Sequence, residues 1–174
     1  EKSPCLHEWA AQAKPVYAAC LDVGLSRLPR PKANFALGID QPLYFSVHSA
    51  VATLGPEDGA MIHIAKYLNP SKETDPHQDE HELEGLLDLM QPGWRGFTFE
   101  RRFLPHMMVT NAQVTAATGG PAGQPRPVVP DIARLYVAGD WVGPEGMLAD
   151  ASLASAKHAA ESIVQDTYSQ AEAA

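Results

Sequence analysis

Short apolar runs separated by polar turns fill the chain up to about residue 110. The run over residues 97–109 alternates hydrophobic and polar residues, as a strand with one buried face does, whereas the run over residues 16–25 is mostly apolar. The turns between them are rich in proline, glycine and aspartate. Because such short connections join antiparallel neighbours, we expect an antiparallel sheet. The predicted strands cover residues 16–25, 35–39, 43–48, 60–68 and 97–109.

Other segments repeat their apolar residues at helical spacing. Ser3 and Pro4 supply an N-cap and first-turn signal for a helix at the start of the chain. Further along, Leu83 and Leu87 belong to one apolar helical face. A run rich in alanine and serine predicts a long helix near the end. The predicted helices cover residues 5–13, 78–90 and 147–168.

A short strand over residues 132–138, apolar at its end, precedes the last of these helices. Strand, glycine-containing turn and helix in that order are typical of a cofactor site in α/β proteins. We therefore predict an α/β fold with α+β character. It consists of an antiparallel-sheet lobe within residues 1–131 and a strand–helix unit over residues 132–174.

Composition excludes some classes of function. With 21 acidic and 13 basic residues, the 174-residue chain has a formal charge of -8 and would repel a nucleic-acid backbone. Cys5 and Cys20 match neither zinc-knuckle nor redox-pair spacing. No apolar run is long enough to span a bilayer, and the first residues do not resemble a secretion signal. We expect a cytoplasmic protein that does not bind nucleic acid.

Candidate chemistry gathers at the tip of the last predicted strand. Gly139 allows a close backbone turn where open α/β sheets bind ligands, and Asp140 places a carboxylate there. After the loop to Gly146, a helix beginning at Met147 and Leu148 would expose unpaired N–H groups and the positive end of its dipole. The carboxylate can accept hydrogen bonds from sugar-alcohol hydroxyls. The helix end suits a ring atom that becomes anionic.

The segment 135–156 resembles the C-terminal FAD-binding motif of the flavin amine oxidase and phytoene desaturase superfamily. There a strand ending in Ala-Gly-Asp, here Ala138-Gly139-Asp140, leads through a loop into a helix of small residues. Segments 42–46, 91–95 and 102–105 look like the substrate domain of phytoene dehydrogenase-like proteins. The resemblance covers most of the chain and is sharpest in the terminal motif.

This resemblance implies a set of contacts to FAD. Asp140 would contact the ribityl or phosphate region, and backbone atoms of Met147 and Leu148 would lie at the edge of the flavin ring. Trp141 would wall the pocket. The implied cofactor-binding residues are Gly139, Asp140, Trp141, Gly146, Met147, Leu148 and Ala151.

The resemblance also implies an FAD-dependent dehydrogenase or oxidase that moves hydride from a C–H bond of an apolar small molecule to flavin. Residues 1–131 would then be part of the substrate domain, and residues 132–174 part of the FAD domain. Complete members carry a Gly-x-Gly-x-x-Gly turn that this sequence lacks. The chain is thus expected to be completed by an N-terminal FAD-binding part, or to be a truncated, non-enzymatic homologue that acts as a homodimerising or binding module. Because flavin performs the difficult step, the catalytic residues stay unknown.

Other constellations favour structural roles. The run from His77 to His81 fits the zinc-binding pattern His-x-x-Glu-His, but it opens a helix among charged neighbours, so we interpret it as a solvated helix start and expect no metal. His48, His63 and His106 fall in predicted strands without ligand spacing. Ser46 lacks the strand–turn–helix context of a hydrolase nucleophile.

Overall fold

The computed structural model describes residues 3–56 and 58–172, which form two compact units. We call Tyr17–Val109 the sheet unit. We call Glu1–Val16 together with Thr110–Ala174 the terminal unit. The units divide near residues 16 and 109. That residues 132–174 belong to a cofactor domain remains a prediction.

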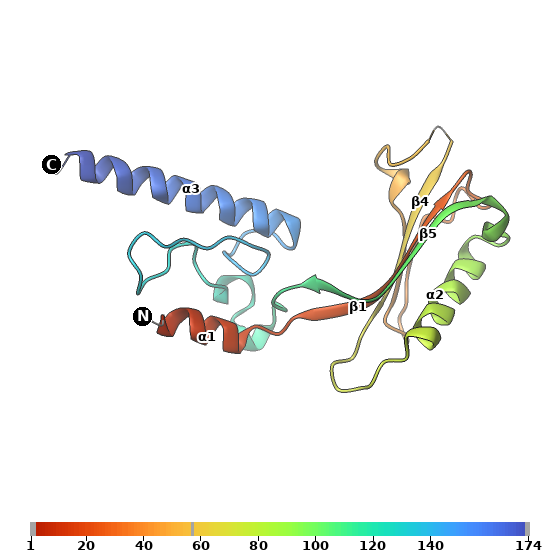
Figure 1. Cartoon of the computed structure of the whole chain (residues 1–174), viewed down its shortest axis with the longest axis horizontal. Helices are drawn as coiled ribbons and strands as arrows, with labels where there is room; N and C mark the ends of the chain where they lie inside the picture. Colours follow the sequence, from red (N-terminus) through yellow and green to blue (C-terminus); the bar gives the residue numbers. More distant parts are fainter. Residues whose placement is uncertain (1–2, 57, 173–174) are drawn as a thin grey trace. The chain divides into compact units, whose positions relative to one another are not determined.

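The sheet has five strands in the order β2-β3-β4-β1-β5 (Figure 1). Strand β2 pairs with β3, β3 with β4, and β4 with β1, all antiparallel. Beside β1, β5 also runs antiparallel: Ser26 N–H donates to Phe97 C=O at one end, and Tyr17 stacks on His106 nearer the other. The strands are β1 Val16–Leu25, β2 Phe35–Leu37, β3 Leu43–Val47, β4 Ala60–Tyr67 and β5 Thr98–Thr110.

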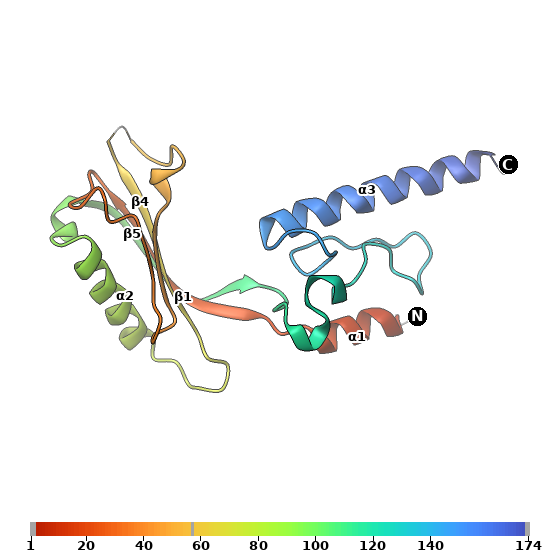
Figure 2. The ribbon, with the colours of Figure 1, turned by 180° about the vertical axis from the view of Figure 1, so that it is seen from behind.

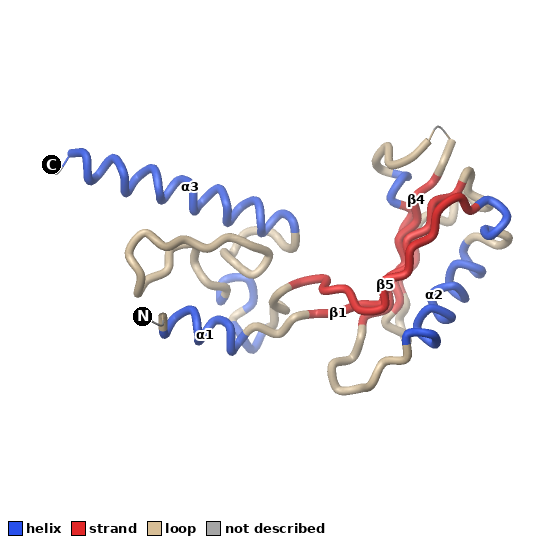
Figure 3. Tube along the Cα trace, viewed as in Figure 1, coloured by secondary structure: helices blue, strands red, loops and turns tan. Residues whose placement is uncertain are grey.

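These observations confirm the mixed class with an antiparallel sheet. The observed bounds of β1 equal the predicted ones, and β3 and β4 each end one residue earlier than predicted. Figure 3 shows the strands as the central feature of the sheet unit. A short 3₁₀ helix, η1 (His48–Ala50), follows β3 directly.

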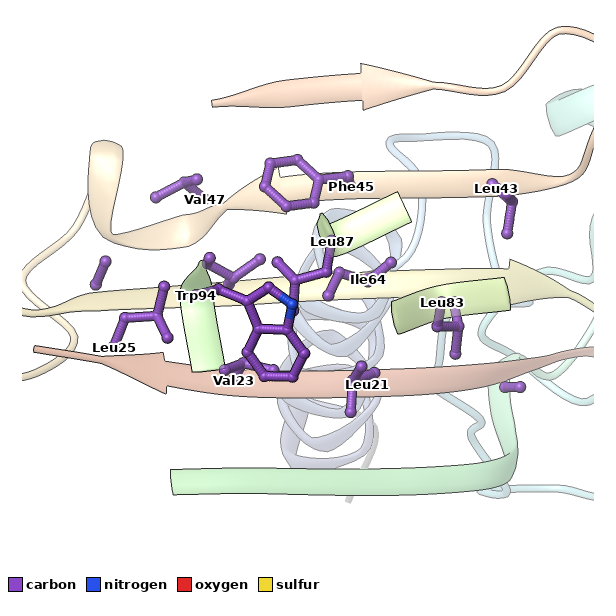
Figure 4. Close-up of a cluster of buried hydrophobic side chains, with 13 residues drawn as sticks. Leu21, Val23, Leu25, Leu43, Phe45, Val47, Ile64, Leu83, Leu87 and Trp94 are labelled. Carbon is purple, nitrogen blue, oxygen red and sulfur yellow. The ribbon is translucent and has the colours of Figure 1, made fainter. Parts of the chain in front are cut away.

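One face of the sheet is covered by α2 (Pro76–Met90), and the main core lies between them (Figure 4). Strand β3 buries every second residue, because alternate side chains of a strand point to opposite faces. The helix contributes Leu83 and Leu87, and the 3₁₀ helix η2 (Trp94–Phe97) adds Trp94. Facing them are Leu21, Val23, Leu25, Phe45, Ile62 and Ile64.

Helix α2 begins at Pro76, two residues before the predicted start. Asp75 caps it by accepting hydrogen bonds from the N–H groups of His77 and Gln78. Proline suits the first helical position because it needs no N–H partner there. The Asp75 cap thus determines where α2 begins, and the apolar face of the helix determines how it packs on the sheet.

Ion pairs fasten α2 to the sheet. Lys66 on β4 lies 2.8 Å from Asp79 and 2.6 Å from Glu82. Arg101 on β5 lies 2.6 Å from Glu80 and 2.7 Å from Glu84. The acidic residues of the candidate zinc pattern, Asp79 and Glu80, therefore have cationic side chains as partners.

A buried amide holds the loop after β1. Gln91 is fully buried; its Oε1 accepts a hydrogen bond from Arg30 N–H, and its Nε2 donates to the carbonyls of Arg30 and Ala33. An unpaired buried amide would be costly, so this side chain and the loop depend on each other.

The terminal unit contains α1 (Pro4–Gln12) and α3 (Ala149–Glu172), as Figure 2 shows from behind. Two 3₁₀ turns, η3 (Ala116–Thr118) and η4 (Gly120–Gly123), lie in the glycine- and proline-rich connection. No helix within the described ranges is both long enough and apolar enough to cross a membrane.

The predicted regular strand over residues 132–138 is wrong. Only an isolated antiparallel bridge forms there, between Val128 and Tyr136. Arg134 has a φ of 63°, and Leu135 N–H donates back to Ile132 C=O, so the chain turns before it can extend. The opposing segment carries prolines, which lack the N–H needed for a longer ladder.

Replacing Leu87 by alanine should lower the free energy of unfolding by about 2–5 kcal/mol, because the side chain is fully buried against the sheet. Urea denaturation followed by circular dichroism measures this change. The matched control is Leu89→Ala on the same helix, where the side chain is 68% exposed; its effect should stay within about 0.5 kcal/mol. Equal losses in the two variants would contradict the packing described here.

Candidate cofactor site

Gly139 lies where the chain passes under α3. Ser155 on that helix accepts a hydrogen bond from Gly139 N–H at 3.0 Å, and its hydroxyl lies 3.2 Å from Gly139 C=O. Ser155 is itself buried. A Cβ atom at Gly139 would lie 2.8 Å from Nε1 of Trp141, so glycine permits the indole to fold back over the backbone.

Trp141 packs within the terminal unit. Its ring meets that of Trp9 edge-on, with centroids 6.2 Å apart and an interplanar angle of 62°. Such a T-shaped contact is a favoured aromatic arrangement. The indole therefore joins α1 to the candidate loop, and its predicted role as a pocket wall remains a prediction.

Asp140 is held by residues at the end of β5. Its Oδ2 accepts hydrogen bonds from Thr110 Oγ1 at 2.6 Å and Asn111 N–H at 2.9 Å, and its Oδ1 accepts one from Asn111 Nδ2 at 2.8 Å. Burial alone would raise the pKa of Asp140. The hydrogen bonds from Thr110 and Asn111 outweigh it and hold the pKa below the usual aspartate value.

The loop meets α3 closely at Gly146. Its φ is 77°, and a Cβ there would lie 2.8 Å from Asp150 Cβ and 3.0 Å from Ala151 N. Glycine is therefore needed both for the backbone conformation and for the close approach. Sequence reasoning placed Gly146 at the end of the loop that leads to the helix.

The helix begins at Ala149, so the predicted start at Met147 is wrong by two residues. Leu148 has a φ of 54°, which is not helical, and Asp150 N–H donates to Met147 C=O at 3.1 Å. The Met147 and Leu148 side chains are 65% and 48% exposed, whereas Ala151 is fully buried. The two residues thus form the turn that leads into α3, and Ala151 faces its own unit.

Sequence reasoning missed Thr110, Asn111 and Ser155. Ser155 was recoverable, because it follows Ala151 by one helical turn on the same face. Nothing in the spacing joins Thr110 or Asn111 to Asp140, about thirty residues further on; only tertiary contact does so.

Part of the segment would suit an FAD. The start of a 24-residue helix carries positive potential, but the N–H groups of Asp150 and Ser152 already donate to the carbonyls of Met147 and Leu148. Gly146 keeps this end free of a side chain. Asp140 offers less, because hydrogen bonds to Thr110 and Asn111 use three of the roughly four acceptor positions of a carboxylate. A hydroxyl of the cofactor would use the remaining position or displace one partner.

No family profile and no curated protein matches this sequence. The chain is similar in fold to a crystal structure of an oxidoreductase from Methanosarcina mazei, with a TM-score of 0.64 and 15% sequence identity. The similarity covers 91% of this chain and 37% of that one. The chain therefore has a fold found within an oxidoreductase, and it spans well under half of that protein's length.

The pKa of Asp140 predicts how stability depends on pH. Its folded pKa lies below the ordinary 3.8, so the ionised carboxylate stabilises the native state above the unfolded pKa. This stabilisation is lost as pH falls through the lower folded pKa. In urea denaturation at a series of pH values, Asp140→Asn should remove part of the decline in stability below roughly pH 4. Asp40→Asn, at an exposed loop position, should preserve that decline; an unchanged profile in Asp140→Asn would refute the assignment.

Proposed function

We propose that this chain is the C-terminal part of an FAD-dependent oxidoreductase of the phytoene desaturase and flavin amine oxidase superfamily. In this proposal the protein is phytoene dehydrogenase-like and removes hydride from a C–H bond of an apolar small molecule. The terminal unit contributes the last contacts to FAD, and the sheet unit contributes to the substrate domain. When bound, FAD supplies the acceptor for the hydride.

The observation that carries the proposal is the close approach of Gly146 to the start of α3. This is the arrangement that the resemblance assigns to the edge of a flavin. The likeness in fold to an oxidoreductase across 91% of the chain supports the same class. Within this arrangement Gly146 keeps the helix end open, and Ser155 fixes the backbone at Gly139.

The outer face of α3 supports completion by further protein. Its inner face buries Ala151, Ser155 and Ala159 within the terminal unit. Leu153 and Val164 are apolar yet exposed elsewhere on the helix. A helix that is apolar on more than one face is typical of the interior of a larger protein. An N-terminal FAD-binding part would cover this surface.

The same exposed residues are also compatible with the alternative function. In that alternative, the protein is a non-enzymatic homologue that dimerises through α3. The two proposals differ in cofactor content and in mass. A flavoprotein binds FAD stoichiometrically. A dimerising module binds no flavin, and its sedimentation gives a molecular mass twice that of one chain. Analytical ultracentrifugation with detection in the visible flavin band distinguishes them.

The experiment that tests the proposal uses the full-length protein that carries this chain. After purification with added FAD, we expect a yellow protein with one flavin per chain. Gly146→Val should bind FAD at least about tenfold more weakly, because a side chain there meets Asp150 and the helix backbone. Gly55→Ala is the control, since a Cβ at Gly55 meets nothing within 4 Å. Circular dichroism verifies that both variants are folded, and a native protein that stays colourless with excess FAD would refute the proposal.

A further inference from the structure

The sheet of the sheet unit has a second face, turned away from α2. Residues on β1, β4 and β3 that alternate with the core residues point to this open face. The register places Asp22 opposite His63, and Ser46 on the other side of His63. These three residues form one row across neighbouring strands, where directly opposed side chains are in contact range.

Asp22 and His63 are joined by a short hydrogen bond, with Oδ1 2.6 Å from Nδ1. A carboxylate can only accept, so Nδ1 of His63 carries the hydrogen. In the neutral imidazole this leaves Nε2 as an unprotonated acceptor. The side chains are 32% and 23% exposed, so the pair is accessible and partly shielded from water.

The surroundings of this pair are mainly apolar. Ala18, Cys20 and Ala65 are buried in a small cluster on the sheet, with Tyr44 packed against it. The Tyr44 ring centroid lies 6.1 Å from that of His63. From η1, His48 stacks on His63 with ring centroids 5.4 Å apart. An oriented imidazole therefore lies in an apolar surface, flanked by aromatic rings.

We propose that the open face binds an apolar alcohol and that His63 Nε2 accepts a hydrogen bond from its hydroxyl group. Asp22 is a positioning residue, because its carboxylate holds the imidazole hydrogen on Nδ1 and so leaves Nε2 as the acceptor.

Other head groups fit this site less well. A carboxylate would be repelled by Asp22 and has no proton to give to Nε2. A hydroxyl is small and neutral, and it donates one hydrogen bond to the one free acceptor.

A purely structural explanation of the Asp22–His63 pair is that it is a cross-strand contact that only stabilises the sheet. That explanation predicts lower stability in variants and no discrimination between ligands. The test therefore compares two probes that differ in hydrogen-bond donation. 1-Octanol donates a hydroxyl hydrogen, and octyl methyl ether, of similar size and polarity, cannot.

Binding of both probes to the full-length protein is measured by NMR titration. We expect 1-octanol to bind about tenfold more tightly than the ether, since a site that pairs a hydroxyl discriminates against an analogue lacking it. His63→Gln should reduce this ratio to about twofold or less. His106→Gln, at a stacked histidine elsewhere in the sheet unit, should keep it. Equal binding of the two probes by the native protein would overturn the proposal.

Nitrogen-15 shifts of the imidazoles test the role of Asp22. We expect His63 in the native protein to carry its hydrogen on Nδ1 when neutral, and Asp22→Asn to shift it toward Nε2. An unchanged tautomer would overturn the positioning role. Flavin content is measured on the same samples, so the two proposals fail separately. A yellow protein without hydroxyl preference contradicts only the alcohol site, and a colourless protein with His63-dependent preference contradicts only the flavin proposal.

Discussion

Leu83, Leu87 and Trp94 pack against one face of the five-stranded sheet, and the organisation of the sheet unit depends on this contact. The free energy gained by hydrophobic burial is proportional to the apolar area removed from water. The core-facing residues of β1, β3 and β4 must therefore stay in register beneath the helix. That register fixes the residues of the opposite face as well. Asp22, His63 and Ser46 are aligned there because Leu21, Ile64 and Phe45 are aligned beneath α2.

The two units present different chemistry. In the terminal unit the chemistry is mostly that of the backbone: Gly146 exposes a helix end, and Ser155 holds both polar groups of Gly139. In the sheet unit it is that of side chains, led by the Asp22–His63 pair.

Local signals predicted the secondary structure of the sheet unit closely, because the apolar run of β1 and the helical spacing in α2 can be read from consecutive residues. The terminal unit was harder. A left-handed residue, Arg134, interrupts the predicted strand, and Leu148 delays α3 by two residues. Arginine and leucine do not predict a positive φ in the sequence, whereas glycine at position 146 does. At the candidate sites, the partners of Asp140 and of His63 are distant in sequence, and the histidine was expected to be merely structural.

The buried amide of Gln91 has a consequence for how this fold can diverge. The site demands one acceptor and two donors at a fixed reach, to serve Arg30 and Ala33 together. Among the twenty amino acids only glutamine offers that combination at that length. Relatives that replace it must also rebuild the loop after β1, so position 91 and residues 30–33 should covary, as a signature that an alignment of homologues would reveal.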